Sequence, residues 1–198
     1  MRKIDKILIG TNNIGKYEEI CNLLPKKVKK YSPKEMKILA PDETGNSFEE
    51  NSLIKASYFC KKTNLICLSD DSGLEIDILK GAPGIYSSRW SGERNNFDLA
   101  MDKIFNEMNK INKNWENISA ARFVCCLTLF FPNGKNYLGK GIINGKISSK
   151  KKGINGFGYD PIFIPYGHEK TFGEMKPHSK MLIDHRYKAY LQIKKFFD

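Results

Sequence analysis

The stretch 68–73, Leu-Ser-Asp-Asp-Ser-Gly, constrains the fold of this 198-residue chain more than any other part of it. The apolar run 66–68 predicts a short buried strand, so that Asp70 and Asp71 would emerge at its carboxyl end, where open α/β sheets form their ligand crevice. Adjacent carboxylates repel one another unless a cation or several donors hold them ionised, and hard oxygen ligands suit Mg²⁺. The pair therefore indicates a metal. The alternative is a solvated Asp-rich turn, because Asp, Ser and Gly are common turn residues.

A second strand followed by a polar turn lies near the N-terminus. Residues 6–10 predict a compact strand, and the pattern after the turn predicts a helix that ends before Pro25. The first turn of a helix presents N–H groups and partial positive charge, so Thr11 and Asn13, with Lys16, would form a phosphate cradle. The alternative is that Thr11 or Asn13 only caps the helix.

A second helix is predicted to begin after Ser47, which forms a capping-box pattern with Glu50, and to run to about Lys62. Glu43 lies in the acidic turn before this helix, where its carboxylate could join the aspartate pair on a metal. Lys55 lies inside the helix, and it is a solvated lysine unless a phosphate is nearby.

The C-terminal half offers a predicted β-hairpin over 120–131 and 136–147 and a glycine-aromatic loop at 156–161. Glycines allow a ligand to approach the backbone, and the aromatic rings of the loop offer flat faces to a nucleobase. Asp160 can accept from ring N–H groups. Turn packing is the alternative interpretation.

Three polar residues near the C-terminus precede or begin a predicted helix: Lys180, His185 and Arg186. They could bind phosphate, or a base through ring and backbone contacts, although a lone histidine is more often structural than catalytic.

The net charge of +11 raises a second class of function, a nucleic-acid-binding module. The lysines are spread along the chain, so a solvated basic surface is favoured, and such a surface would also attract a nucleoside triphosphate. A hydrophobic content of 40% argues against disorder. No apolar run approaches the roughly 20 residues that cross a bilayer, and the first residues lack a signal-peptide core, so we expect a cytoplasmic protein without a membrane partner.

Six stretches of the chain, in this order, resemble the inosine triphosphatase (Ham1-like) family of non-standard purine nucleoside triphosphate pyrophosphatases. They are 11–16 (TNNIGK), 43–45 (ETG) with 48–51 (FEEN), 69–74 (SDDSGL), 81–87 (GAPGIYS), 156–161 (GFGYDP) and 184–186 (DHR).

The resemblance implies one domain, 1–198, with an elongated α/β fold of two lobes. A long mixed central β-sheet would be flanked by helices, with the active-site cleft between the lobes. It also implies a homodimer that hydrolyses ITP, dITP or XTP to the monophosphate and pyrophosphate with Mg²⁺, and no stable nucleic-acid partner.

Residue by residue, the resemblance implies three groups of site residues. Glu43 and Asp71 would bind the metal, and Asp71 would also be the general base. The residues that would contact the triphosphate are Thr11, Asn12, Asn13, Gly15, Lys16 and Lys55, and Ser72 would make a further contact with the substrate. The nucleobase wall comprises Phe157, Gly158, Tyr159, Asp160, Lys180, His185 and Arg186.

Two positions depart from the family pattern. Asn12 replaces the usual glycine, which adds a side chain beside the phosphates, and Asp184 replaces the serine before the His-Arg pair, which adds a carboxylate near the base. A Maf-like pyrophosphatase acting on modified pyrimidine triphosphates is a third hypothesis, against which the base-wall residues argue.

Overall fold

The computed structural model describes residues 4–93 and 95–198. Its strands are β1 Lys6–Ile9, β2 Lys29–Tyr31, β3 Cys67–Ile76, β4 Ala120–Phe130, β5 Asn136–Ile147 and β6 Phe163–Pro165. Its α-helices are α1 Ile14–Leu23, α2 Phe48–Thr63, α3 Phe97–Ile111, α4 Pro177–Met181 and α5 His185–Ile193.

The six strands form one sheet in the order β2-β1-β3-β4-β5-β6. Both β2 and β3 pair parallel to β1, whereas β6 pairs antiparallel to β5, so the sheet is mixed. The predicted α/β class, a mixed sheet flanked by helices, is confirmed.

The chain divides into two compact units. Unit 1 comprises the described residues up to Asp71 together with Cys125–Gly141 and His185–Asp198. Unit 2 comprises Ser72–Val124 and Ile142–Asp184. Three strands, β3, β4 and β5, contribute residues to both units.

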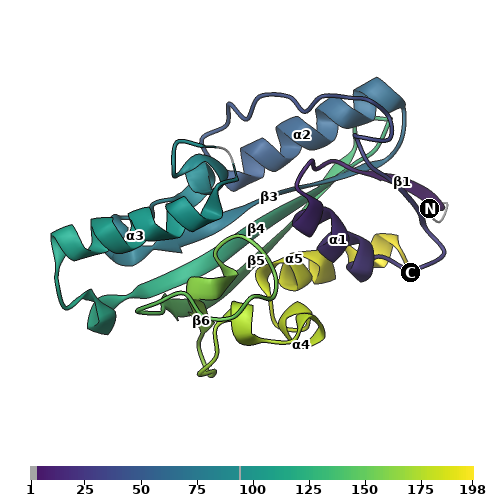
Figure 1. Ribbon diagram of the computed structural model, residues 1–198. Coiled ribbons are helices and arrows are strands. Elements are labelled where there is room, and N and C mark those ends of the chain that lie inside the picture. Colours follow the sequence, from purple (N-terminus) through teal and green to yellow (C-terminus); the bar gives the residue numbers. More distant parts are fainter. Residues whose placement is uncertain (1–3, 94) are drawn as a thin grey trace. The chain divides into compact units, whose positions relative to one another are not determined.

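In unit 1, helices cover both faces of the strands, with α2 on one side and α1 and α5 on the other (Figure 1). Successive side chains of a strand point to opposite faces. Accordingly Ile7 and Ile9 join the apolar cluster with α1 and α5, whereas Leu8 joins the cluster with α2. Burial on both faces explains why β1 is a continuous apolar run rather than an alternating one.

Unit 2 has its own apolar core. Helix α3 contributes its buried face, Ala100, Met101, Ile104 and Met108. The rings of Phe123 and Phe163 lie with centroids 4.7 Å apart in the same cluster. Each unit is therefore stabilised by the burial of apolar side chains in a core of its own.

The predicted helix boundaries near the site are close to the observed ones. Ser47 caps α2 by accepting from the N–H of Glu50 at 3.1 Å, and α2 ends at Thr63. The Glu50 carboxylate accepts from the N–H of Asn46 at 2.7 Å rather than completing a capping box on Ser47. The predicted hairpin is confirmed as β4 and β5, closed by the N–H of Phe131 donating to the carbonyl of Lys135 at 2.9 Å.

The boundary predicted for the third strand is wrong. The sequence pattern places Asp70 and Asp71 after a short strand, but β3 runs from Cys67 to Ile76 and contains both. Acidic residues usually interrupt a buried strand because burying a charge is costly, but here cations from other elements pair with both carboxylates. The stretch 70–73 is therefore strand interior rather than a turn.

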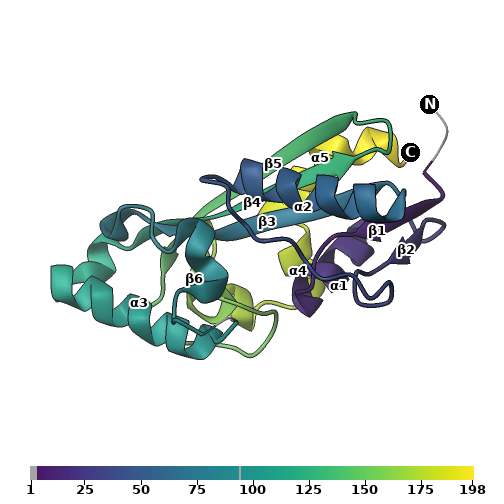
Figure 2. The same ribbon diagram turned by 90° about the horizontal axis from the view of Figure 1, so that it is seen from above.

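The edge strand β2 has no counterpart in the sequence prediction. It is three residues long and pairs with β1 in the register Lys6↔Lys29, Ile7↔Lys30 and Leu8↔Tyr31. Figure 2 shows β2 beside β1 at the edge of the sheet. Two of its three residues are lysines, so a search of the sequence for apolar runs does not detect this strand.

No helix within 4–93 and 95–198 is long and apolar enough to cross a membrane.

Candidate active site

Parallel pairing of β1 and β3 brings the loop after β1 next to the acidic stretch of β3. Ile9 pairs with Leu68, and the N–H of Gly10 donates to the Leu68 carbonyl at 2.8 Å. A Cβ at Gly10 would lie 2.0 Å from the Ser69 hydroxyl oxygen, so only glycine permits this approach. The loop that begins at Thr11 consequently starts beside the two aspartates.

Asp70 is fully buried and bound to two cations. One carboxylate oxygen lies 2.7 Å from Lys16 Nζ, and the other accepts from Arg186 Nε at 3.2 Å and from the Cys125 thiol at 3.1 Å. Burial would raise the pKa of this carboxyl, but the charges of Lys16, Arg186 and Lys55 outweigh burial and hold the pKa below its usual range. Asp70 is thus a buried anion that fixes two basic side chains.

Asp71 belongs to a different cluster. Its Oδ1 lies 2.8 Å from Lys55 Nζ, and the same ammonium lies 2.5 Å from Glu43 Oε1. Burial raises the pKa of Asp71, the charges of Lys55 and Lys16 lower it, and the nearby Glu43 charge raises it again, so that the pKa lies above its ordinary value. A carboxylate with a raised pKa is a better proton acceptor at neutral pH.

Hydrogen bonds at the start of α2 hold the segment that carries Glu43. The buried side chain of Asn51 accepts from the N–H of Gly45 at 2.8 Å. A Cβ at Gly45 would lie 2.8 Å from that same oxygen and 2.6 Å from the Cβ of Glu50. The backbone just after Glu43 is therefore tied to the helix that also carries Lys55.

The Glu43 and Asp71 carboxylates offer the hard oxygen ligands that Mg²⁺ takes in proteins. Asp71 Oδ2 is buried and accepts no hydrogen bond from the described residues, so it has capacity for another partner. Among those residues, no group of three histidines, cysteines or acidic residues is placed to hold a metal ion. The residues present therefore fit a cation that takes its remaining ligands from water or substrate.

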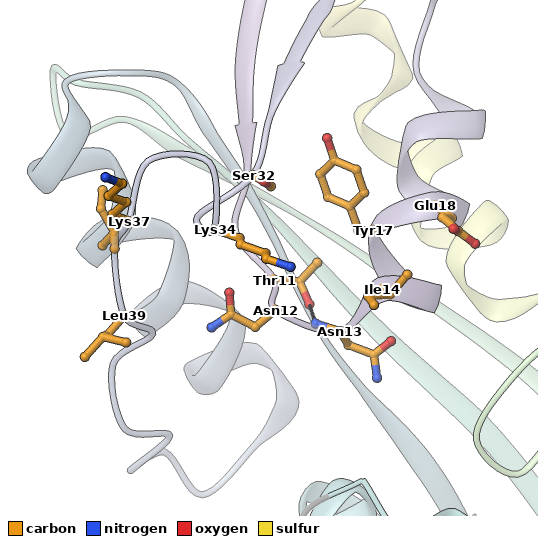
Figure 3. A pocket seen from close by; sticks show the side chains of 11 residues that line it. Thr11, Asn12, Asn13, Ile14, Tyr17, Glu18, Ser32, Lys34, Lys37 and Leu39 are labelled. Carbon is orange, nitrogen blue, oxygen red and sulfur yellow. Dashed lines mark hydrogen bonds between the residues drawn. The ribbon is translucent and has the colours of Figure 1, made fainter.

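The loop 11–13 and the start of α1 form the predicted phosphate cradle. Asn13 caps α1 by accepting from the N–H of Lys16 at 3.0 Å, and the Thr11 hydroxyl accepts from the N–H of Asn13 at 3.2 Å. Gly15 lies in the first turn of α1, where N–H groups have no acceptor within the helix. Asn12 is exposed and lines a pocket of about 640 Å³ next to this loop (Figure 3). Both interpretations of the stretch, cap and cradle, are compatible with this geometry.

The glycine-aromatic loop of unit 2 is organised around Asp160. Its Oδ2 accepts from Lys180 Nζ at 2.6 Å and from the N–H of Phe157 at 2.9 Å. Lys180 Nζ also lies 5.0 Å from the centroid of the Phe157 ring. Gly156 and Gly158 have φ of +74° and +65°, in the left-handed region that favours glycine. The structure therefore brings three predicted base-wall residues together.

Another base-wall prediction, Tyr159, has packing contacts of its own. Tyr159 is buried, its hydroxyl donates to the carbonyl of Ser87 at 2.7 Å, and its ring packs edge-on against Phe97. Ser72, the predicted substrate contact, is the first residue of unit 2 and is half-buried in β3.

His185 and Arg186 lie in unit 1, in the first turn of α5, and both are buried. The guanidinium of Arg186 pairs with Glu19 of α1 as well as with Asp70. Asp184, the departure before this pair, is also buried. The sequence analysis did not predict that Glu19 and Cys125 contact Arg186 and Asp70. The one signal for Glu19 in the sequence is that it lies three residues after Lys16, on the same side of a helix.

The model of the Ham1 family matches residues 7–196, and the chain belongs to this family. A protein of Zymomonas mobilis subsp. mobilis called dITP/XTP pyrophosphatase is 40% identical over 189 residues, which cover 95% of this chain and 90% of that protein. A protein of Caulobacter vibrioides with the same name is 38% identical, with 96% of each chain covered. The solved structure of a HAM1 protein from Coxiella burnetii matches with a TM-score of 0.85 and 33% identity, covering 96% of each chain.

Proposed function

We propose that this protein hydrolyses the non-standard purine nucleoside triphosphates dITP, ITP and XTP to the nucleoside monophosphate and pyrophosphate. Membership of the Ham1 family and the names of relatives about 40% identical support this activity. The main structural observation behind this proposal is the cluster in which Lys55 Nζ contacts both the Glu43 and the Asp71 carboxylates. The second oxygen of Asp71 accepts no hydrogen bond from the described residues and could bind a metal ion.

In the proposed reaction, water attacks the α-phosphorus in line with the leaving oxygen. A bond forms between the water oxygen and the α-phosphorus, and the bond from the α-phosphorus to the oxygen of the β-phosphate breaks, so pyrophosphate leaves. Asp71 takes the proton of the water, which its raised pKa favours. Lys55 holds the Asp71 carboxylate in place at 2.8 Å.

Thr11, Asn12, Asn13 and Gly15 would bind phosphate oxygens through side chains and first-turn N–H groups. Lys16 and Lys55 would add positive charge as the leaving group develops negative charge. Glu43 and Asp71 would hold Mg²⁺, which neutralises phosphate charge when bound. We expect the enzyme to act in the cytoplasm as a homodimer.

The base would be recognised by Phe157, Gly158, Tyr159, Asp160, Lys180, His185 and Arg186, with Ser72 as a further substrate contact. Hypoxanthine and xanthine carry a 6-oxo group, which accepts hydrogen bonds from cationic or N–H donors. The 6-amino group of adenine would donate toward those donors and leave buried groups unpaired, so discrimination can reach roughly 10⁴-fold.

The test is the release of pyrophosphate and orthophosphate from ITP, XTP, dITP, ATP and GTP, with Mg²⁺ and with a chelator. We expect metal-dependent pyrophosphate from the first three substrates and almost none from ATP and GTP. Orthophosphate as the product, equal rates on all purines, or activity confined to modified pyrimidine triphosphates would each contradict the proposal. Salt-sensitive binding to nucleic acid without turnover would support the alternative binding module instead.

A further inference from the structure

The pocket beside the loop 11–13 is lined in part by residues that follow β2. Strands β1 and β2 are parallel, with Leu8 paired to Tyr31, so the residues after each strand lie at the same edge of the sheet. Ser32 and Lys34 from the one segment and Thr11 from the other consequently line the same pocket (Figure 3). In Figure 3 the ammonium of Lys34 points toward Thr11.

An ordered turn presents Lys34. The Glu35 carboxylate accepts from the N–H of Ser32 at 2.7 Å and from its hydroxyl at 2.9 Å. The N–H of Ile38 donates to the carbonyl of Pro33 at 2.9 Å and closes the turn. The Glu35 carboxylate is therefore held on Ser32 and forms no ion pair with Lys34.

The side chains of the clusters in unit 1 carry more negative than positive charge. Lys16, Lys55 and Arg186 supply three positive charges, all of them bound to carboxylates. The carboxylates in the same clusters, when ionised, supply four negative charges: Glu19, Glu43, Asp70 and Asp71. A nucleoside triphosphate adds about four more negative charges, which a bound Mg²⁺ would offset only in part, so a further cation near the phosphates would strengthen binding.

Lys34 is a cation without such a partner. Within 4–93 and 95–198 no carboxylate forms an ion pair with its ammonium. Glu18, an acidic residue that lines the pocket, lies on the far side of Tyr17 from Lys34 in Figure 3. Ile14, Tyr17 and Ile38 give the pocket apolar walls, and a charge beside apolar walls attracts an anion more strongly than one in open water.

We infer that Lys34 is a substrate-binding residue whose ammonium contacts the terminal phosphates of the triphosphate held by the loop 11–13. The inference rests on the proposed function. It adds a cation from the segment after β2, outside the stretches that carry the family resemblance. Lys34 would hold the pyrophosphate part of the substrate before and after cleavage, without taking part in proton transfer.

The test compares Lys34→Ala and Lys34→Arg with the control Lys37→Ala. Lys37 lines the same pocket, and its replacement by alanine removes the same charge as Lys34→Ala does. Its ammonium, however, points away from Thr11 in Figure 3. Two quantities are measured: the KM and kcat for ITP, and the affinity for inorganic pyrophosphate by calorimetry in the absence of any triphosphate.

We expect Lys34→Ala to raise the KM and to weaken pyrophosphate binding, each by about tenfold, as for one lost charge-assisted hydrogen bond. The kcat should change less, Lys34→Arg should restore binding, and Lys37→Ala should stay within about twofold of the wild type. Equal effects of the two alanine variants would reveal general charge attraction and overturn the inference.

The inference about Lys34 would also be overturned if Lys34→Ala bound pyrophosphate as tightly as the wild type, or if the wild type bound no pyrophosphate. A wild type that cleaves no triphosphate would refute the proposed function. Calorimetry would still decide the role of Lys34 in that case.

Discussion

Asp70 and Asp71 are adjacent in the chain, but their carboxylates point to opposite sides of β3. Asp70 lies 2.7 Å from Lys16 of α1, and Asp71 lies 2.8 Å from Lys55 of α2. Alternation of side chains along a strand produces this separation. The two acids therefore have different ion-pair partners, and they should differ in what their loss does to the protein.

Asp71→Asn should lower turnover by orders of magnitude without unfolding the protein. The amide cannot take a proton from water, and loss of a general base typically lowers kcat by about 10²–10⁴-fold. The measurement is pyrophosphate release from ITP at saturating substrate and Mg²⁺, beside a thermal melt of the same variant. A near-normal rate would remove Asp71 as the base.

Asp70→Asn should act mainly on stability. The change leaves the ammonium of Lys16 facing a neutral group, whereas Arg186 keeps Glu19 as an ion-pair partner. Breaking a buried ion pair in this way costs about 3–5 kcal/mol of unfolding free energy. Urea unfolding measures the loss, with Asp71→Asn as the matched control, because Lys55 keeps Glu43 as a partner there. A midpoint equal to that of the wild type would contradict the prediction.

Phe157→Ala should weaken the binding of purine triphosphates. Stacking of a base on an aromatic ring is worth about 1–3 kcal/mol, so the KM for ITP should rise by roughly 10–100-fold. Phe157→Tyr keeps a ring and should remain close to the wild type. The same KM for Phe157→Ala and the wild type would show that this ring does not contact the base.

Gly141→Ala should destabilise the packing of α5 on β5. A Cβ at this position would lie 1.9 Å from the carbonyl oxygen of His185 and 2.5 Å from the nitrogen of Ala189, both backbone atoms that cannot rotate away. Overpacking of this kind costs about 1–3 kcal/mol or more. Thermal unfolding checks the prediction, with Leu138→Ala as the control. Leu138 is an exposed residue of the same strand and should change stability by about 0.5 kcal/mol or less. Equal melting temperatures for Gly141→Ala and the wild type would contradict the packing argument.

Local patterns in the sequence determined the elements that depend on neighbouring residues. The apolar run 6–10, the cap at Ser47 and the hairpin around Gly134 each became the predicted strand, helix and turn. Caps, turns and apolar periodicity act within a few residues, so they can be read without knowing the fold. The six motifs were together specific enough to indicate the family that the match over residues 7–196 confirmed.

Only the tertiary structure decided which charges meet. Asp70 is 116 residues from Arg186 and 55 from Cys125, and no local pattern links them. These partners also explain why β3 continues through two acids, since a buried carboxylate is stable in a strand when cations from other elements surround it. The edge strand β2 is likewise defined by its pairing with β1, which brings Lys34 and Thr11 to the same pocket. Ion pairs and strand pairing join distant residues, so the chain must fold before they exist.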